Sequence, residues 1–169
     1  GLFGALNGII VTKIGINSII TTLGTMALIR GLTYWIAMDV EAMQVGRITD
    51  PAFLNFGRYY FPEGSRLIPI TLVYIVILYG LSYLFLSHTS FGRKIYAVGS
   101  NEATARLAGI NVKRVKLVCY IIAGALSAFG GLVLVAQLGL GEAYTGQNMI
   151  LEVVTAVVLG GVLLTGGKG

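Results

Sequence analysis

The sequence is poor in charge. Charged residues make up 11% of its 169 residues, and the mean hydropathy is +0.83. Soluble domains carry about 25% charged residues. A globule built from this chain would therefore lack the polar side chains needed to cover its surface in water. The scarcity of charge argues against a water-soluble domain and favours a chain whose apolar surface faces lipid.

Cysteine and histidine are almost missing as well. Cys119 is the sole cysteine, so the chain forms no internal disulfide. His88, the sole histidine, has no cysteine or carboxylate cluster near it in sequence, which argues against a metal site. A phosphate-binding GxxxxGK[ST] loop is absent too, because the terminal Gly-Gly-Lys-Gly lacks both the spacing and the following hydroxyl. We predict no catalytic residue, no metal and no cofactor in this chain.

The chain also lacks an initial Met and the charged segment of a signal peptide. It begins at Gly1 inside an apolar run and stops at Gly169 inside a glycine-rich stretch. We expect both ends to be cuts in a longer protein, with residues 1–169 forming part of a single transmembrane domain.

Long apolar runs fill most of the sequence. Residues 67–86 and 117–138 contain no charge, and each run of roughly 20 residues is long enough to cross a bilayer as a helix. A third span is predicted over residues 14–38, and residues 2–11 form the end of an earlier helix. Residues 153–164 are short for a full span, so a re-entrant or partly buried helix and a span both stay open. The predicted fold is an all-α, polytopic transmembrane bundle of about four spans plus this short helix.

Glycine is abundant, with 24 residues, and small side chains let membrane helices approach closely. Three small-xxx-small pairs occur: Gly4 with Gly8, Gly124 with Ala128, and Ser127 with Gly131. These pairs predict faces where helices pack.

Basic residues set the orientation. Residues 88–116 hold six basic residues and one acidic residue, whereas residues 39–66 hold three basic and four acidic residues. Excess lysine and arginine marks the cytoplasmic side of a membrane protein. Loop 88–116 is therefore predicted inside and loop 39–66 outside, with Lys13 inside and Glu142 outside. The same rule explains the net charge of +5 without nucleic acid.

A short capped helix is predicted within the basic loop. Asn101 is a favourable N-cap, Glu102 suits the positive end of the helix dipole, and Gly109 suits a left-handed C-terminal residue. Ala103, Leu107 and Ile110 form a narrow apolar stripe. Such a short helix is marginal alone in water. It either docks into a groove of a partner or lies on the membrane surface within a solvated loop.

Polar groups inside the apolar segments have two interpretations. Arg30 either reaches the outer interface or pairs with another helix, or it contacts the substrate. Asn7 forms an interhelical hydrogen bond or lines a path. Glu152 is a third candidate for the path or for helix pairing.

The run 92–111, GRKIYAVGSNEATARLAGIN, resembles the cytoplasmic signature of ribose-type sugar ABC transporter permeases. Further similarity lies in Leu6-Asn7-Gly8, in residues 22–26 and 30–31, and in a glycine-rich motif formed by residues 157–161, Leu164 and residues 166–169. The similarity covers nearly the whole chain except loop 39–66. The sequence departs from the family at Met38-Asp39-Val40-Glu41, at Gln137 where an arginine is frequent, and at Ile150, where Glu152 supplies an acid two positions later.

The resemblance implies a permease subunit in the bacterial cytoplasmic (inner) membrane that imports a ribose-like sugar. It implies two ABC ATPase subunits that bind the ATP, a second permease subunit in a homo- or heterodimer, and an extracytoplasmic solute-binding protein. It also assigns coupling to the ATPase to the short cytoplasmic helix, which adds Arg106 to the six residues named above: Asn101, Glu102, Ala103, Leu107, Gly109 and Ile110.

Two other functions stay open. A branched-chain amino-acid ABC permease would share the architecture and differ in substrate. A secondary transporter or channel commonly carries acidic residues or histidines in mid-span, and residues 67–86 and 117–138 contain neither.

Overall fold

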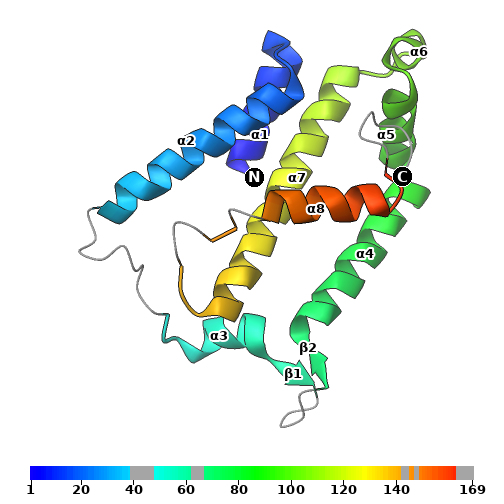
Figure 1. Cartoon of the computed structure of the whole chain (residues 1–169). Helices are drawn as coiled ribbons and strands as arrows, with labels where there is room; N and C mark the ends of the chain where they lie inside the picture. The colour runs from blue at the N-terminus through cyan, green and yellow to red at the C-terminus, as the bar shows by residue number, and fades with distance from the viewer. Residues whose placement is uncertain (39–47, 62–66, 142–144, 147–148, 163–169) are drawn as a thin grey trace.

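The computed structural model describes residues 1–38, 48–61, 67–141, 145–146 and 149–162. Figure 1 shows the chain, whose elements are α1 (Leu2–Ile9), the π-helix η1 (Ile10–Ile14), α2 (Ser18–Met38), α3 (Pro51–Arg58), β1 (Tyr60–Phe61), β2 (Ile68–Pro69), α4 (Ile70–His88), α5 (Ser90–Ser100), α6 (Glu102–Leu107), α7 (Val112–Leu138) and α8 (Met149–Leu159). Within the described ranges, β1 and β2 are the only strands. The chain is therefore mostly helical, as predicted.

Among the residues that the structure describes, three helices are long and apolar enough to cross a membrane: Ser18–Ile36 in α2, the whole of α4 and the whole of α7. They correspond to the predicted spans 14–38, 67–86 and 117–138, with shifted ends. α4 starts late because Ile68 and Pro69 pair with β1. α7 starts early because the Asn111 side chain caps it, accepting a hydrogen bond of 3.1 Å from the Arg114 backbone N–H.

The last described helix differs from the predicted segment 153–164. α8 has 11 residues, which span roughly 16 Å at 1.5 Å per residue and fall short of a bilayer core. Its described side chains are exposed, and it runs across the directions of α4 and α7 (Figure 1). The end of the predicted segment, with the second half of the glycine-rich motif, lies outside the described residues.

Glycine residues let α1 and α7 pack closely against each other. A Cβ atom added at Gly4 would collide with the Tyr120 carbonyl oxygen, and one added at Gly8 would lie 2.7 Å from Leu117 Cδ1. From the other side, a Cβ added at Gly124 would lie 2.9 Å from Gly4 Cα. The predicted packing role is confirmed for these three glycines. Ser127, Ala128 and Gly131, by contrast, are exposed in this chain.

α1 and α2 meet through a buried polar contact. The Thr25 hydroxyl donates to Asn7 Oδ1 at 2.5 Å, and the same hydroxyl lies 2.9 Å from the Thr21 carbonyl oxygen in its own helix. Asn7 therefore makes the interhelical hydrogen bond that its sequence position predicted. The bond satisfies the amide oxygen of Asn7 inside an otherwise apolar contact.

The described part of the predicted external loop 39–66 forms structure that the sequence did not predict. α3 lies across the end of α7, because Gly57 leaves room for it: a Cβ there would lie 2.8 Å from the Ala136 backbone carbon. Arg58 Nε donates to the Gln137 carbonyl oxygen at 2.7 Å, and Gln137 Nε2 donates to Thr71 Oγ1 at 2.6 Å. These bonds tie α3, α4 and α7 together, so predicted loop 39–66 is partly ordered; residues 39–47 and 62–66 lie outside the described part.

An aromatic cluster supports the same junction. The rings of Phe56 (α3), Tyr74 (α4) and Phe129 (α7) lie 5.2–5.9 Å apart, and two of the three pairs are edge-to-face. Tyr74 also donates its hydroxyl hydrogen to the Phe56 carbonyl oxygen at 3.0 Å. Each such aromatic pair contributes about 0.5–1.5 kcal/mol beyond the buried area. α3 is therefore fixed on both long helices.

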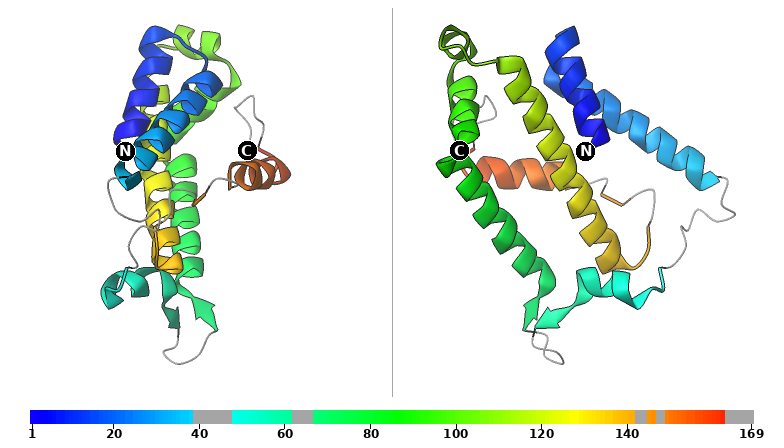
Figure 2. Two further views of the ribbon diagram at one scale, coloured as in Figure 1. Left: turned by 60° about the vertical axis from the view of Figure 1, so that its left-hand side comes forward. Right: turned by 180° about the vertical axis from the view of Figure 1, so that it is seen from behind.

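At the opposite, basic end, α5 and α6 connect α4 to α7 (Figure 2). Val98, Ala105, Val112 and Val115 form a small buried cluster there, with Phe91, Ile95, Ile110 and Cys119 packed against it. η1, which carries Lys13, lies at the same end as α6 (Figure 1). α4 and α7 are thus bridged at both ends, by α3 at one and by α5 and α6 at the other.

Candidate functional site

The short helix α6 has the caps that its sequence predicts. Asn101 Oδ1 accepts hydrogen bonds from the backbone N–H groups of Ala103 and Thr104, at 2.9 and 3.1 Å. Gly109 has φ of +78°, the left-handed conformation that glycine adopts most easily. Its N–H and that of Ile110 bond back to the Arg106 and Ala105 carbonyls at 3.0 Å, which closes the helix. Both predicted caps are confirmed.

The predicted stripe of Ala103, Leu107 and Ile110 is wrong as a single face. Ala105 is the buried residue of α6, with 3% of its surface exposed, whereas Leu107 is 91% exposed. Ile110 packs on the small cluster, because the left-handed Gly109 turns the chain back toward α7. α6 therefore rests on α5 and α7 through Ala105. It presents Ala103 and Leu107, which are one helical turn apart, away from the molecule.

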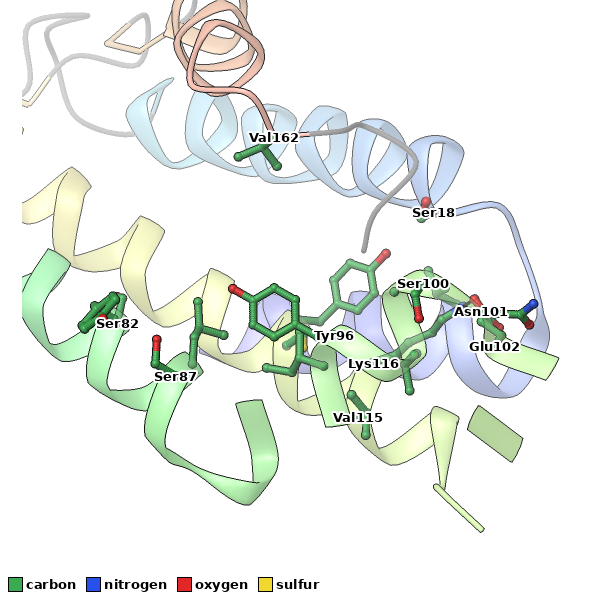
Figure 3. Close-up of a pocket in the computed structure, with 18 of the residues that line it drawn as sticks. Ser18, Ser82, Ser87, Tyr96, Ser100, Asn101, Glu102, Val115, Lys116 and Val162 are labelled. Atoms are coloured by element: carbon green, nitrogen blue, oxygen red, sulfur yellow. Dashed lines mark ion pairs between the residues drawn. The ribbon is translucent and has the colours of Figure 1, made fainter. Parts of the chain in front are cut away.

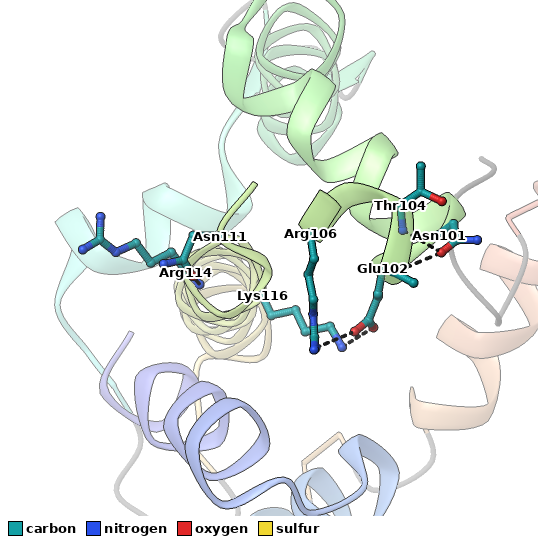
Figure 4. A network of polar contacts seen from close by, with 8 residues as sticks. Asn101, Glu102, Thr104, Arg106, Asn111, Arg114 and Lys116 are labelled. Carbon is teal, nitrogen blue, oxygen red and sulfur yellow. Dashed lines mark hydrogen bonds and ion pairs between the residues drawn. The ribbon is translucent and has the colours of Figure 1, made fainter. Parts of the chain in front are cut away.

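An ion-pair network fixes α6 to α7 (Figure 4). Glu102 pairs with Lys116 of α7 and also lies 3.7 Å from Arg106, one turn along its own helix. These side chains are 36–64% exposed, so the pairs add little stability. They fix the orientation of α6 instead, since they join its start to the first turns of α7. Glu102 and Arg106 were predicted as site residues, but Lys116 was not, because no local pattern indicates a contact between separate helices.

The basic segment 88–116 is more ordered than the predicted loop. Most of it is helical, because α5 precedes α6 and α7 begins at Val112. Thr89 caps α5, its hydroxyl oxygen accepting a hydrogen bond from the Gly92 N–H at 3.0 Å. The helical spacing of the apolar residues Phe91, Ile95 and Val98 was the sequence signal that could have indicated this helix. Val98 faces the small cluster while Arg93 and Lys94 stay exposed.

A cavity of about 1040 Å³ opens between α4, α5 and α7, beside α6. Figure 3 shows it with Ser82 and Ser87 of α4 on one wall, Tyr96 of α5 near the middle, and Glu102 and Lys116 toward α6. Hydroxyl groups dominate its polar lining, which consists of Ser18, Tyr79, Ser82, Tyr83, Ser87, Tyr96, Ser100, Asn101, Glu102, Lys116 and Tyr120. Sequence reasoning missed this cavity, although Tyr79, Ser82, Tyr83 and Ser87 recur at helical spacing in an otherwise apolar span.

The three predicted polar candidates lie apart from this cavity. Asn7 is engaged with Thr25 between α1 and α2. Arg30 is half-buried on α2 and, in the described ranges, forms no hydrogen bond or ion pair. Glu152 is exposed on α8. The structure does not bring these three together, and the part of the chain that it describes contains no group of three or more potential metal ligands.

Residues 1–167 match the family model described as branched-chain amino acid transport system / permease component. The ribose import permease protein of Bacillus subtilis is 39% identical over 96% of this chain and 49% of its own length. The L-arabinose transport system permease protein of Escherichia coli is 40% identical over 97% of this chain and 48% of its own length. The autoinducer 2 import system permease protein of Klebsiella pneumoniae is 34% identical over 99% and 46%.

The chain spans about half the length of these curated relatives. No solved structure matches it significantly.

Proposed function

This chain belongs to the branched-chain amino acid transport system / permease component family, and we propose that it is part of the membrane-spanning subunit of an ABC importer for a ribose-like sugar. The subunit is a multi-pass protein of the bacterial cytoplasmic membrane. Its partners are two ATPase subunits that bind the ATP, a second permease subunit and an extracytoplasmic solute-binding protein. The chain itself holds no ATP and catalyses no reaction.

One observation carries the proposal: α6 is capped at both ends, is seated on α7 through Ala105, and exposes Leu107 at the basic end of the molecule. A large apolar side chain that is 91% exposed at the tip of a capped helix is available as an anchor for a partner. It suits a groove in a cytoplasmic protein that receives a short helix. We assign that groove to the ATPase subunit.

The topology follows from the same assignment. The end that carries α5, α6 and Lys13 is cytoplasmic, because its basic residues outnumber its acidic ones. The end that carries α3 and loop 39–66 is external. In this topology α1 with η1, α2, α4 and α7 are spans or part-spans, α8 is a re-entrant or partly inserted helix, and residues 88–116 are the coupling segment.

In the proposed mechanism, movement of the ATPases passes to the membrane helices through the contacts of α6 with α5 and α7. Closure of the ATPases on ATP pushes on α6, and the Glu102–Lys116 pair together with the Val98 cluster passes this displacement to α7 and α5. α5 continues from α4, so both long helices tilt together. Their tilt switches the path between outward and inward access, as an interface with two discrete arrangements does.

The lining of the cavity favours a sugar over a branched-chain amino acid. Glu102 and Lys116 are the charged residues among those that line it, and they pair with each other. A zwitterion needs unpaired charges of both signs, whereas a sugar needs hydroxyl and amide partners. The three relatives described above are permease proteins for ribose import, L-arabinose transport and autoinducer 2 import.

Crosslinking tests the docking of α6. In the full-length permease with Cys119→Ala, the Leu107→Cys thiol is treated with a short bifunctional thiol reagent in the presence of the ATPase subunits. We expect a permease–ATPase product, and none from Tyr60→Cys at the opposite end of the molecule. Absence of the Leu107→Cys product in a complex that still couples ATP hydrolysis to uptake refutes the proposed docking.

A further inference from the structure

Serine and threonine hydroxyls along the membrane helices fall into two groups. Most donate to a carbonyl oxygen of their own helix, as Thr21, Thr33 and Ser127 do at 2.9 Å. Ser82 and Ser87 of α4 make no hydrogen bond within the described part of the chain, and both line the cavity. In a membrane helix the back-bond to the helix carbonyl is the ordinary way to satisfy a hydroxyl. Its absence leaves these two hydroxyls free for another partner.

Tyrosines that line the same cavity supply further hydroxyl groups. Tyr79 and Tyr83 lie one turn apart on α4, close in sequence to Ser82 and Ser87, and Tyr96 lines the same cavity from α5. Their phenol groups make no hydrogen bond within the described ranges, although the Tyr83 ring contacts that of His88 at 6.2 Å. Tyrosine combines an apolar ring with a polar tip. Such rings accept the apolar C–H face of a polyol while their hydroxyls bond to its edge.

The size and charge of the cavity fit the same kind of ligand. Its volume of about 1040 Å³ lies just above the usual range for small-molecule sites, about 300–1000 Å³, and leaves room for a sugar. The charges of Glu102 and Lys116 compensate one another at the α6 end of the cavity. A neutral solute with many hydroxyl groups therefore finds partners here and leaves no charge unpaired.

We propose that Ser82, Ser87 and Tyr96, with the rings of Tyr79 and Tyr83, form a binding site for the neutral polyhydroxylated solute in the cytoplasmic half of the path. The inference rests on the proposed function, since it assigns the site at which the transported sugar pauses after leaving the outer half. This permease then contributes to selectivity itself, in addition to the solute-binding protein.

Protection from thiol labelling tests the site. The full-length permease with its ATPases, free of solute-binding protein, carries Cys119→Ala and Ser87→Cys. The rate of N-ethylmaleimide labelling is measured with and without the sugar, D-ribose or L-arabinose, that the complete transporter takes up. The sugar is expected to slow labelling at Ser87→Cys, and L-leucine is not. The control Ser127→Cys, on α7 outside the cavity lining, is expected to label at the same rate in all conditions.

Second-site changes identify the hydrogen-bonding groups. Adding Ser82→Ala or Tyr96→Phe is expected to raise the sugar concentration for half-protection roughly three- to tenfold each, the usual effect of losing one hydrogen bond. Ser127→Ala and Tyr60→Phe, added in the same way, are expected to leave that concentration unchanged.

Two results overturn the inference. One is an unchanged labelling rate at Ser87→Cys over millimolar sugar, in a transporter that still takes up that sugar. The other is protection by L-leucine in place of the sugar. The first leaves the proposed transport function intact. Failure of the complete transporter to take up any sugar, with uptake of L-leucine, refutes the proposed function itself.

Discussion

At the scale of single residues, Leu107 and Gly109 define the exposed helix. Leu107 projects from a helix of six residues that has no face buried except at Ala105. Gly109 ends that helix in a conformation that other residues adopt only with strain. In the proposed docking, Leu107 supplies the contact with the ATPase and Gly109 holds the helix end that carries it.

Leu107→Ala is expected to weaken association with the ATPase subunits. Truncating a buried anchor residue to alanine weakens binding by about 2 kcal/mol or more, which is roughly 30-fold in affinity. The measurement is the dissociation constant between permease and ATPase in detergent. The matched change Leu67→Ala, at an exposed leucine beside β2 at the opposite end of the molecule, is expected to have less than a threefold effect. Equal effects of the two changes would contradict the assignment of Leu107 as the anchor.

Gly109→Ala is expected to destabilise the end of α6 by roughly 1–2 kcal/mol, because the φ of +78° becomes strained. The assembled transporter should then hydrolyse more ATP per sugar molecule imported. The control Gly24→Ala meets open space at ordinary φ and should keep the wild-type ratio. A wild-type ratio in Gly109→Ala would show that the left-handed turn does not matter for coupling.

At the scale of elements, the contact between α1 and α7 depends on glycine. A Cβ atom at Gly4 would collide with the backbone of α7 at Tyr120, whereas one at Gly130 meets nothing within 4 Å. Backbone cannot move aside as a flexible side chain does. The two positions should therefore respond in opposite ways to the same added methyl group.

Gly4→Ala is expected to lower the melting temperature of the detergent-solubilised permease by separating α1 from α7. Gly130→Ala should leave it unchanged or raise it, because alanine is favoured over glycine in helices by about 0.5–1 kcal/mol. Thermal unfolding followed by circular dichroism compares the two. A higher melting temperature for Gly4→Ala would disprove the close contact.

The elements that the sequence predicted are those with local signals. α4 and α7 follow from long uncharged runs, and α6 from Asn101 and Gly109 at its ends. α3 was not predicted, although Asp50 caps it and Pro51 occupies its first position. What fixes it in place is contact with the end of α7, distant in sequence, at Gly57 and Arg58. α5 was not predicted either, because its exposed Arg93 and Lys94 gave the segment the appearance of a basic loop.

The candidate site, like the fold, was predictable only where its signals are local in the sequence. The caps of α6 are local and were found. The pairing of Glu102 with Lys116 and the convergence of Ser82 with Tyr96 depend on how α4, α5 and α7 are arranged in space. No spacing within one segment encodes that arrangement. The stripe that joined Ile110 to Leu107 failed because the positive φ of Gly109 reverses the chain between them.

At the scale of the whole molecule, the two ends differ in charge and in structure. The α6 end carries the exposed basic residues Arg93, Lys94 and Lys113, and the α3 end is closed by a bridge of hydrogen bonds and aromatic rings. The bridges make α4 and α7 a frame that is held together at both ends. In the proposed mechanism, this frame would transmit a displacement of α6 to the α3 end.

Thiol labelling in intact cells tests the orientation of α4 and α7 in the membrane. Lys113→Cys and Tyr60→Cys, each with Cys119→Ala, place thiols at exposed positions on opposite ends. A membrane-impermeant maleimide should label Tyr60→Cys and reach Lys113→Cys only after the cells are opened. The reverse pattern would invert the topology and remove α6 from the cytoplasm.

The central claim, that α6 joins ATP hydrolysis to sugar movement, is tested most directly by ATP-driven uptake in proteoliposomes. They contain the full-length permease, its ATPases and its binding protein, with radiolabelled D-ribose or L-arabinose outside. We predict uptake of one of these sugars on addition of ATP, and a loss of at least tenfold for Leu107→Asp, since an aspartate cannot be buried in an apolar groove without a cost of about 1.4 kcal/mol or more. Wild-type uptake by Leu107→Asp, or ATP-driven uptake of L-leucine with neither sugar, would contradict the account.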